Sequence, residues 1–169
     1  MINNYINILA NILIKTVWKK VEKIKHLKIY LAGKMSGLTF EQMNTWRVCL
    51  KELLLKTAEN SDYKLTVINP VDFYNFESNR QQTETEVEDY DLAHVISSDI
   101  VIVNVKGLDS SDGTKFELHD ANYHNRIPVI ALDEENLYWY LHPWIKRDIT
   151  RVEKYMNSVV EYIKDFYMF

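Results

Sequence analysis

Residues 110–118, SSDGTKFEL, carry the side chains of this chain best suited to nucleophilic chemistry. They lie between the apolar runs IVIVNV and IPVIALD, where a strand is expected to give way to a helix. Gly113 and Thr114 lead into that helix, whose free N–H groups favour negative charge. Glu117 is therefore expected to stay ionised, as a nucleophile must. The alternative is structural, because Thr114 and Glu117 have the spacing of a capping box.

The loop AGKMSGLT, residues 32–39, is a second candidate for ligand binding. Gly33 and Gly37 would let the backbone approach a ligand closely, and Lys34 and Ser36 can contact an anion. An ordinary tight turn explains the same residues. The chain has neither the G-x-G-x-x-G pattern nor the Walker lysine motif, which disfavours a dinucleotide-binding or P-loop function.

Two more residues, Asp91 and Tyr30, have side chains that could take part in a reaction, but each has an ordinary structural role as its default. Asp91 lies on an expected helix that ends where the strongest strand begins, and its default role is a solvated surface carboxylate. Tyr30 lies in the first expected strand, where a core tyrosine is the default. The histidines at positions 94, 119, 124 and 142 have no mutual spacing that suggests a metal site, so no metal and no cofactor are expected.

Composition limits the class of protein. The 169 residues are 47% hydrophobic and 26% charged, which suits one globular domain. A net charge of −4 argues against a broad nucleic-acid-binding surface, although a local anion site needs only a few backbone N–H groups. Cys49 is the single cysteine, so no disulfide framework is possible, and a reducing, cytoplasmic setting is the default expectation.

Hydrophobic patterns predict alternating strands and helices. The strongest strand is DIVIVNV, a β-branched run, and the second strand ends at the breaker pair Asn69-Pro70. The expected strands are residues 28–32, 64–68, 99–105 and 127–132. The expected helices are residues 40–58, 85–97, about 115–124 and about 148–164, and residues 71–83 are expected to form a polar, aromatic-bearing loop.

This alternation predicts a parallel sheet with right-handed crossovers. The continuous apolar strands fit burial on both faces of that sheet. Ligands of such sheets bind beyond the carboxyl ends of the strands. The loops AGKMSGLT, NPVDFYN and KGLDSSDGT are all expected at that edge, which makes it the predicted site.

The first 25 residues have a pattern of their own. Apolar side chains recur at helical spacing over residues 2–25, which predicts an amphipathic helix. It lacks the basic start of a signal peptide, and no stretch has the length of a membrane span. We expect it to pack on the body of the protein or on a second subunit. A membrane-surface helix, with its lysines on the polar side, is the alternative.

Five segments, taken in order, resemble the nucleoside 2-deoxyribosyltransferase family. They are IYLAGKMSG, VINPVDFY, YDLAHVISSDIVIVN, SSDGTKFELHDANYHNRIPVIAL and HPW. The resemblance implies a domain over residues 28–169, with residues 1–27 as an added N-terminal amphipathic helix. It also implies a flavodoxin-like, doubly wound parallel sheet, in agreement with the alternation of elements.

The resemblance implies an enzyme that cleaves the N-glycosidic bond of 2′-deoxynucleosides. By position in the motifs, Glu117 would attack the anomeric carbon and form a covalent deoxyribosyl-enzyme, and Tyr30 would hold it. Asp91 would handle the leaving base, and a second base or water would then take the sugar. The transition state resembles an oxocarbenium ion, which a carboxylate stabilises before bonding to it. The resemblance also implies a homo-oligomer built from dimers.

Departures from the family pattern leave the substrate open. Transferases have an aspartate six residues before the nucleophile, whereas this chain has Ser111, as in the related 2′-deoxynucleoside 5′-monophosphate N-hydrolases. Ser111, Lys34 and Ser36 could form a small phosphate pocket, although the arginine of those hydrolases is missing at Ser36. His119 occupies a normally small position and could crowd the site or a subunit contact. The candidate substrate-binding residues are Gly33, Lys34, Ser36, Ser111, Gly113 and Thr114.

Three alternatives to a transferase therefore remain. The first is the monophosphate hydrolase, and the second is a non-catalytic nucleotide-binding module that kept the fold, which His119 favours and the intact Tyr30, Asp91 and Glu117 disfavour. The third is an NAD-cleaving glutamate enzyme of the Toll/interleukin-receptor type. The order of the motifs disfavours that third alternative.

Overall fold

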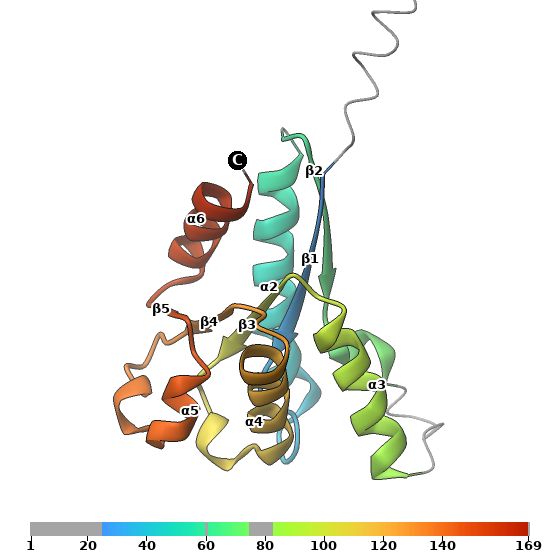
Figure 1. Ribbon diagram of the computed structural model, residues 1–169, viewed down its shortest axis with the longest axis vertical. Coiled ribbons are helices and arrows are strands. Elements are labelled where there is room, and N and C mark those ends of the chain that lie inside the picture. Colours follow the sequence, from blue (N-terminus) through green and yellow to red (C-terminus); the bar gives the residue numbers. More distant parts are fainter. Residues whose placement is uncertain (1–24, 60, 75–82, 169) are drawn as a thin grey trace, which may run out of the picture.

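The structure, a computed structural model, describes residues 25–59, 61–74 and 83–168, and their strands form one parallel sheet of five (Figure 1). The strand order is β2-β1-β3-β4-β5. The strands are β1 (Lys25–Ala32), β2 (Tyr63–Ile68), β3 (Ile100–Asn104), β4 (Val129–Leu132) and β5 (Arg151–Glu153). This order is that of the flavodoxin-like sheet, so the predicted fold class is confirmed.

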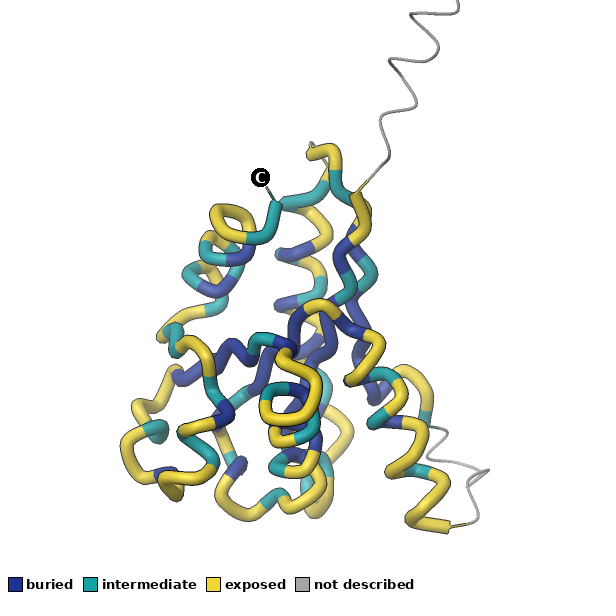
Figure 2. Tube along the Cα trace, in the orientation of Figure 1, coloured by how far each residue is buried: buried dark blue, intermediate teal, exposed yellow. Residues whose placement is uncertain are grey.

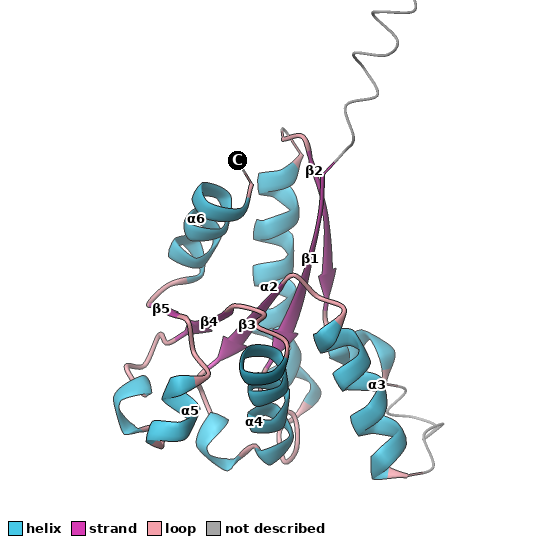
Figure 3. Ribbon diagram, in the orientation of Figure 1, coloured by secondary structure: helices cyan, strands magenta, loops and turns pink. Residues whose placement is uncertain are grey.

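Helices cover both faces of the sheet (Figure 3). The helices α2 (Phe40–Ala58) and α6 (Met156–Tyr167) pack on one face, whereas α3 (Glu84–Ile96) and α4 (Asp112–His119) pack on the other. Ile29 and Leu31 of β1 belong to the first core, and Tyr30 and Ala32 belong to the second, because successive side chains of a strand point to opposite faces. Between these two layers β3, β4 and the carboxyl half of β1 are almost wholly buried (Figure 2).

Short helical segments connect these elements at the edges. They are the 3-10 helices η1 (Pro70–Phe73), η2 (Leu108–Ser110) and η4 (Tyr138–Tyr140), the π-helical turn η3 (Asp120–His124) and the helix α5 (Pro143–Arg147). Two of the long helices begin at capping boxes, where Thr39 pairs with Gln42 and Thr83 pairs with Glu86. These caps satisfy backbone N–H groups that a helix start leaves free, and they explain why α2 and α3 start where they do.

The prediction of one helix over residues 148–164 is wrong in its first half. Residues Arg151–Glu153 form β5, which pairs with β4, and α6 begins only at Met156. The apolar residues Ile149 and Val152 do contact the core, but from an extended chain. Pairing with β5 satisfies backbone groups of β4 that would otherwise be unpaired at the edge of the sheet. The helical spacing of the apolar residues does not reveal this pairing.

Two other expectations change at their boundaries. The expected loop over residues 71–83 begins with the 3-10 turn η1, and residues 75–82 lie outside the described residues. The N-terminal helix was expected to reach residue 25, but Lys25 pairs with Tyr63 as the first residue of β1. The rest of that helix, residues 2–24, also lies outside the described residues. Of the helices in the described ranges, none has the length and apolar character needed to cross a membrane.

Arg47 of α2 is fully buried and fixes the carboxyl end of β1. Its Nε donates to the carbonyl of Leu31 at 3.1 Å, its Nη2 donates to the carbonyl of Gly33 at 2.7 Å, and its Nη1 donates to the carbonyl of Met43. A Cβ at position 33 would lie 3.2 Å from Nη2, so the absent side chain of Gly33 makes room for this guanidinium. Arg47 thereby positions the loop that leaves β1.

We predict that Arg47→Met lowers the free energy of unfolding by about 3 kcal/mol or more. Three buried carbonyls would lose a charged donor, and a hydrogen bond that involves a charged group contributes about 1.5–3 kcal/mol. Arg151→Met is the matched control, because Arg151 is exposed, pairs with Glu153 and lies over the ring of Tyr162, and it should cost about 1 kcal/mol or less. Urea denaturation measures both. Equal stability of the two variants would show that the guanidinium does not hold this part of the fold.

Candidate active site

A buried hydrogen bond joins Tyr30 of β1 to Glu117 of α4. The Tyr30 hydroxyl donates to Glu117 Oε1 at 2.7 Å. Tyr30 is fully buried and Glu117 is 8% exposed. These two residues stand 87 positions apart in the chain, and they meet because β1 lies next to β3, after which α4 follows. The structure thus brings together two residues that the sequence singled out.

Glu117 takes no part in a capping box, so that alternative is wrong. The helix α4 begins at Asp112, about three residues earlier than predicted, with Ser111 as its N-cap. Thr114 therefore lies inside the first turn, where its hydroxyl contacts Ser111 Oγ at 2.9 Å. Glu117 lies one turn further on, and its side chain turns into the protein toward Tyr30.

Asp91 of α3 is the second carboxylate of the site. It is 8% exposed, so its default interpretation as a solvated surface residue is wrong. Tyr74 donates a hydrogen bond to Asp91 Oδ2 at 2.6 Å. The other oxygen, Oδ1, is buried and has no hydrogen-bond partner within the described residues. A buried carboxylate oxygen without a hydrogen bond is energetically costly. We therefore expect Oδ1 to accept a hydrogen bond from a ligand or to carry a proton.

Sequence reasoning missed Tyr74 and Arg47. Tyr74 follows β2, in one of the three loops expected at the carboxyl edge of the sheet, and that position was a usable signal. Asn69 caps the turn η1, which precedes Tyr74: its Oδ1 accepts from the backbone N–H of Val71 at 3.1 Å. Arg47 occupies a place in the apolar stripe of α2 whose other buried members are Met43, Leu50 and Leu54. A charged residue in a buried stripe was the signal for it.

Burial controls the protonation of both carboxyl groups. Burial raises the pKa of Glu117 to about 8; the negative charge of Asp91 adds to this rise, while the hydrogen bond from Tyr30 and the charge of Arg47 oppose it. Burial also raises the pKa of Asp91, against the hydrogen bond from Tyr74 and the charges of His94 and Arg47. Burial thus opposes the negative charge on Glu117 that the helix N-terminus was expected to favour.

The arrangement suits chemistry that needs one carboxylate and one carboxylic acid. Two carboxyl groups that interact in a site of low polarity titrate as a pair, and near neutral pH the pair holds a proton. One member can then act as a base or nucleophile while the other donates the proton. Each member is oriented by a tyrosine hydroxyl, Tyr30 for Glu117 and Tyr74 for Asp91.

Of the predicted substrate-binding residues, some lie close to one another and others stand apart. The side chain of Lys34 crosses from the β1 loop to Ser110, and its Nζ donates to Ser110 Oγ at 2.7 Å. Ser111 lies next to this contact and is half-buried. Gly113 is exposed in the first turn of α4. Ser36 is exposed in a turn, and no hydrogen bond in the described part of the chain engages its side chain.

His119 does not crowd the carboxyl pair. Its Nδ1 lies 3.0 Å from Asp148 Oδ2, and its ring stacks on Tyr123 with the ring centroids 4.8 Å apart. These contacts direct the imidazole toward the C-terminal end of α5. In the described ranges, no group of three or more histidine, cysteine, aspartate or glutamate side chains is arranged to hold a metal ion.

We predict that Glu117→Gln becomes increasingly stabilising relative to wild type as the pH rises from 5 to 8. The folded-state pKa of about 8 lies above the unfolded value, so folding binds a proton. The stability from Glu117 is fully present below the unfolded pKa. Between the two pKa values it is lost as the pH rises, at about 1.4 kcal/mol for each pH unit. Glutamine is neutral throughout and escapes this loss.

Thermal or urea unfolding at several pH values measures the effect. Glu161→Gln, at an exposed position of α6, is the matched control and should show no widening of the gap. A constant difference between Glu117→Gln and wild type would mean that Glu117 is already ionised in the folded protein at neutral pH.

Comparison with known proteins finds similar structures. No protein-family model matches the sequence, and no curated protein matches it significantly. The structure is similar to that of a conserved protein from Enterococcus faecalis V583, with a TM-score of 0.64 and 19% sequence identity, over 83% of this chain and 98% of that chain.

Two further similar structures are those of enzymes. One is a 2-deoxyribosyltransferase from Bacillus psychrosaccharolyticus, with a TM-score of 0.59 and 23% identity, over 80% of this chain and 91% of that chain. The other is the CMP N-glycosidase of Clostridium botulinum, with a TM-score of 0.50 and 16% identity, over 82% of this chain and 98% of that chain. At these identities the likeness is one of fold, so this chain shares its fold with a 2-deoxyribosyltransferase and a CMP N-glycosidase.

Proposed function

We propose that this protein cleaves the N-glycosidic bond of 2′-deoxynucleosides and passes the sugar to another base or to water. The observation that carries the proposal is the pair of buried carboxyl groups, Glu117 and Asp91, each held by a tyrosine hydroxyl. The fold supports it, because two proteins that share the fold are a 2-deoxyribosyltransferase and a CMP N-glycosidase.

Glu117 is the proposed nucleophile. Its Oε1 accepts the hydrogen bond from Tyr30. No hydrogen bond among the described residues engages its Oε2, so that oxygen can attack the anomeric carbon. Attack forms a carbon–oxygen bond to Glu117 as the carbon–nitrogen bond to the base breaks. The transition state carries positive charge on the sugar, so ionised Glu117 stabilises it before the covalent bond forms. A 2′-deoxy sugar lacks the electron-withdrawing hydroxyl that would oppose this charge.

Asp91 is the proposed acid. The departing base takes the electron pair of the broken bond and needs a proton on a ring nitrogen. Burial raises the pKa of both carboxyl groups, so the pair holds a proton near neutral pH, and the reaction needs that proton on Asp91. The unpartnered Oδ1 of Asp91 is the atom from which it would leave. In the second step a new base or a water molecule attacks the sugar, returns its proton to Asp91 and releases Glu117.

A 5′-monophosphate substrate is the second candidate, and the loop before α4 favours it. Ser111 and Thr114 present neighbouring hydroxyl groups there, and Lys34 reaches the adjacent Ser110. Asp112, whose charge would oppose a phosphate, is paired with Lys115 at 2.9 Å. Ser36 makes no contact with this group, so the phosphate pocket expected from the sequence would lack it.

The homo-oligomer expected from the resemblance stays a prediction. Aromatic side chains beside α4 offer a surface for it, since Phe116 is 64% exposed and Trp144 is 78% exposed. They border a groove that also carries Asp112, Lys115, Arg147 and Asp148. Two charges of each sign allow such a patch to pair with a copy of itself about a two-fold axis.

We predict that Glu117→Ala lowers base release by at least about 1,000-fold, because the loss of a nucleophile removes transition-state stabilisation worth several powers of ten. The assay incubates the protein with deoxynucleosides and their 5′-monophosphates, with and without free adenine, and identifies the products by mass spectrometry. Base exchange indicates a transferase, and sugar or sugar phosphate indicates a hydrolase. Acid-quenched wild type, and not the variant, should carry an added deoxyribosyl group.

The matched control is Glu161→Ala, which should keep wild-type turnover. If Glu117→Ala keeps it too, Glu117 has no part in the reaction. If the wild type turns over none of these substrates yet binds them, the non-catalytic nucleotide-binding module replaces the enzyme.

We predict that Asp91→Asn slows the cleavage of natural purine deoxynucleosides by about 10²–10⁴-fold, the usual contribution of a general acid. A deoxynucleoside with an acidic leaving group should lose less than about tenfold, because its leaving group needs no proton. The measurement is kcat/KM on both substrates. Equal losses on the two would assign Asp91 to binding or to folding instead.

A further inference from the structure

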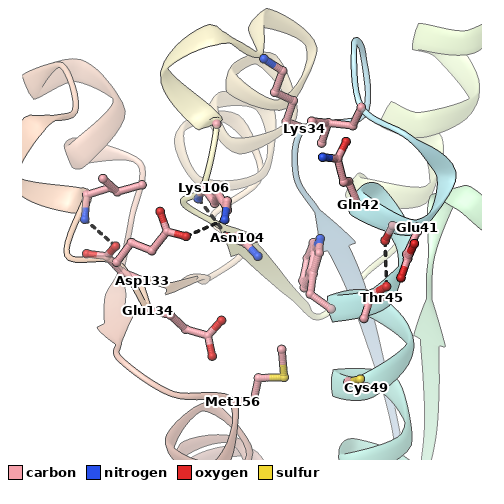
Figure 4. Close-up of a pocket in the computed structure, with 15 residues that line it drawn as sticks. Lys34, Glu41, Gln42, Thr45, Cys49, Asn104, Lys106, Asp133, Glu134 and Met156 are labelled. Carbon is pink, nitrogen blue, oxygen red and sulfur yellow. Dashed lines mark hydrogen bonds and ion pairs between the residues drawn. The ribbon is translucent and has the colours of Figure 1, made fainter.

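A second cavity lies at the carboxyl edge of the sheet, on the side covered by α2 and α6. It has a volume of about 610 Å³, and its walls come from α2, from the loops after β1, β3 and β4, and from the start of α6 (Figure 4). Neither Glu117 nor Asp91 lines it, nor do Tyr30 and Tyr74. This volume is in the range of small-molecule sites, and β1 and β3 flank the switch point of the sheet, where such folds bind ligands.

One wall of this cavity is the indole of Trp46. Trp46 is half-buried, and the guanidinium of Arg47 lies 4.7 Å from the centre of its ring. Arg47 is fully buried and does not line the cavity, so it backs the indole from the protein side. The indole is thereby held in place, and the part of it that lines the cavity offers an aromatic surface, the kind of surface on which a planar ring stacks.

Several charged groups of the cavity are already engaged within the protein. Lys106 Nζ pairs with Glu135 Oε1 at 2.6 Å. Asp133 accepts the backbone N–H groups of Leu137 at 2.7 Å and of Tyr138 at 3.0 Å, one on each carboxylate oxygen. These residues shape the wall, and their charges are largely satisfied without a ligand.

Four side chains of the lining keep polar atoms for a ligand: Glu41, Gln42, Asn104 and Glu134. Gln42 accepts from the backbone N–H of Thr39 through Oε1 and keeps its Nε2 as a donor. No hydrogen bond among the described residues engages the carboxylate of Glu41 or that of Glu134. Asn104 uses its Oδ1 to accept from the backbone of Lys106, which leaves its Nδ2 as a donor. Figure 4 shows Glu41 and Glu134 on opposite sides of the cavity, with Asn104 from the end of β3.

We propose that this cavity is a second binding site, for a planar nitrogen heterocycle that bears an amino group, such as an aminopurine or an aminopyrimidine. The ring stacks on Trp46, the amino group donates to the carboxylate of Glu134, and a ring nitrogen accepts from Asn104. The carboxylates of Glu41 and Glu134 disfavour anions there, because the two lysines of the lining are engaged elsewhere, Lys34 with Ser110 and Lys106 with Glu135. The proposal stands on the cavity alone and does not rest on the proposed reaction.

Cys49 provides a direct test, because it is the single cysteine of the chain, is exposed and lines the cavity. The probe is 2-aminopurine, whose fluorescence falls when it stacks on an indole. At saturation it should slow the alkylation of Cys49 by N-ethylmaleimide at least about fivefold and lose fluorescence in parallel. Purine, which lacks the amino group, should bind about tenfold more weakly, as expected for one lost hydrogen bond to a charged acceptor.

Variants separate this cavity from the carboxyl pair. Trp46→Leu and Glu134→Gln should each weaken 2-aminopurine binding about tenfold or more, and Glu134 is exposed, so its substitution leaves the fold intact. Glu117→Gln should leave both the binding and the protection of Cys49 unchanged. The proposal is overturned if millimolar 2-aminopurine leaves the alkylation rate unchanged. It is equally overturned if Glu117→Gln abolishes binding while Glu134→Gln does not, or if spermidine protects Cys49 as well as 2-aminopurine does.

Discussion

The hydrogen bond between Tyr30 and Glu117 is the interaction on which the site depends. It joins a residue near the carboxyl end of a central strand to a helix that follows the neighbouring strand, and both partners are buried. A carboxyl group in such surroundings needs a partner, because burial without a hydrogen bond costs several kcal/mol. The helix α4 must therefore start early enough to direct Glu117 inward, and its start at Asp112 satisfies this condition.

The charge balance around this bond explains the chemistry that we propose. Glu117 and Asp91 are buried near each other, and Arg47 is the buried cation whose charge acts on both. Its N–H groups are engaged by three backbone carbonyls, so it lowers the pKa of the carboxyl groups from a distance and pairs directly with neither. Such an arrangement keeps a proton on the pair, which suits a reaction that needs one nucleophile and one acid.

The parallel sheet gathers two different sites at one edge. Its crossovers bring the loops after β1, β2 and β3 to the same edge. Successive side chains of β1 point to opposite faces, so the residues of the two faces belong to two separate cores. The carboxyl pair belongs to the face of α3 and α4, whereas the cavity lies on the face of α2 and α6. Arg47 lies between them, since its charge acts on Glu117 and its guanidinium stacks on Trp46.

The sequence by itself determined the fold class and the four main strands, because periodicity is a local property of the chain. Its resemblance to the nucleoside 2-deoxyribosyltransferase family supplied Tyr30, Asp91 and Glu117 as candidate site residues. Only the tertiary structure decided that β5 is a strand, that Thr114 and Glu117 form no capping box, and that burial raises the pKa of Glu117. It also revealed Tyr74 and Arg47 as neighbours of the carboxyl pair. These facts depend on sheet-edge pairing and on desolvation by residues distant in the chain, and neither can be read from local spacing.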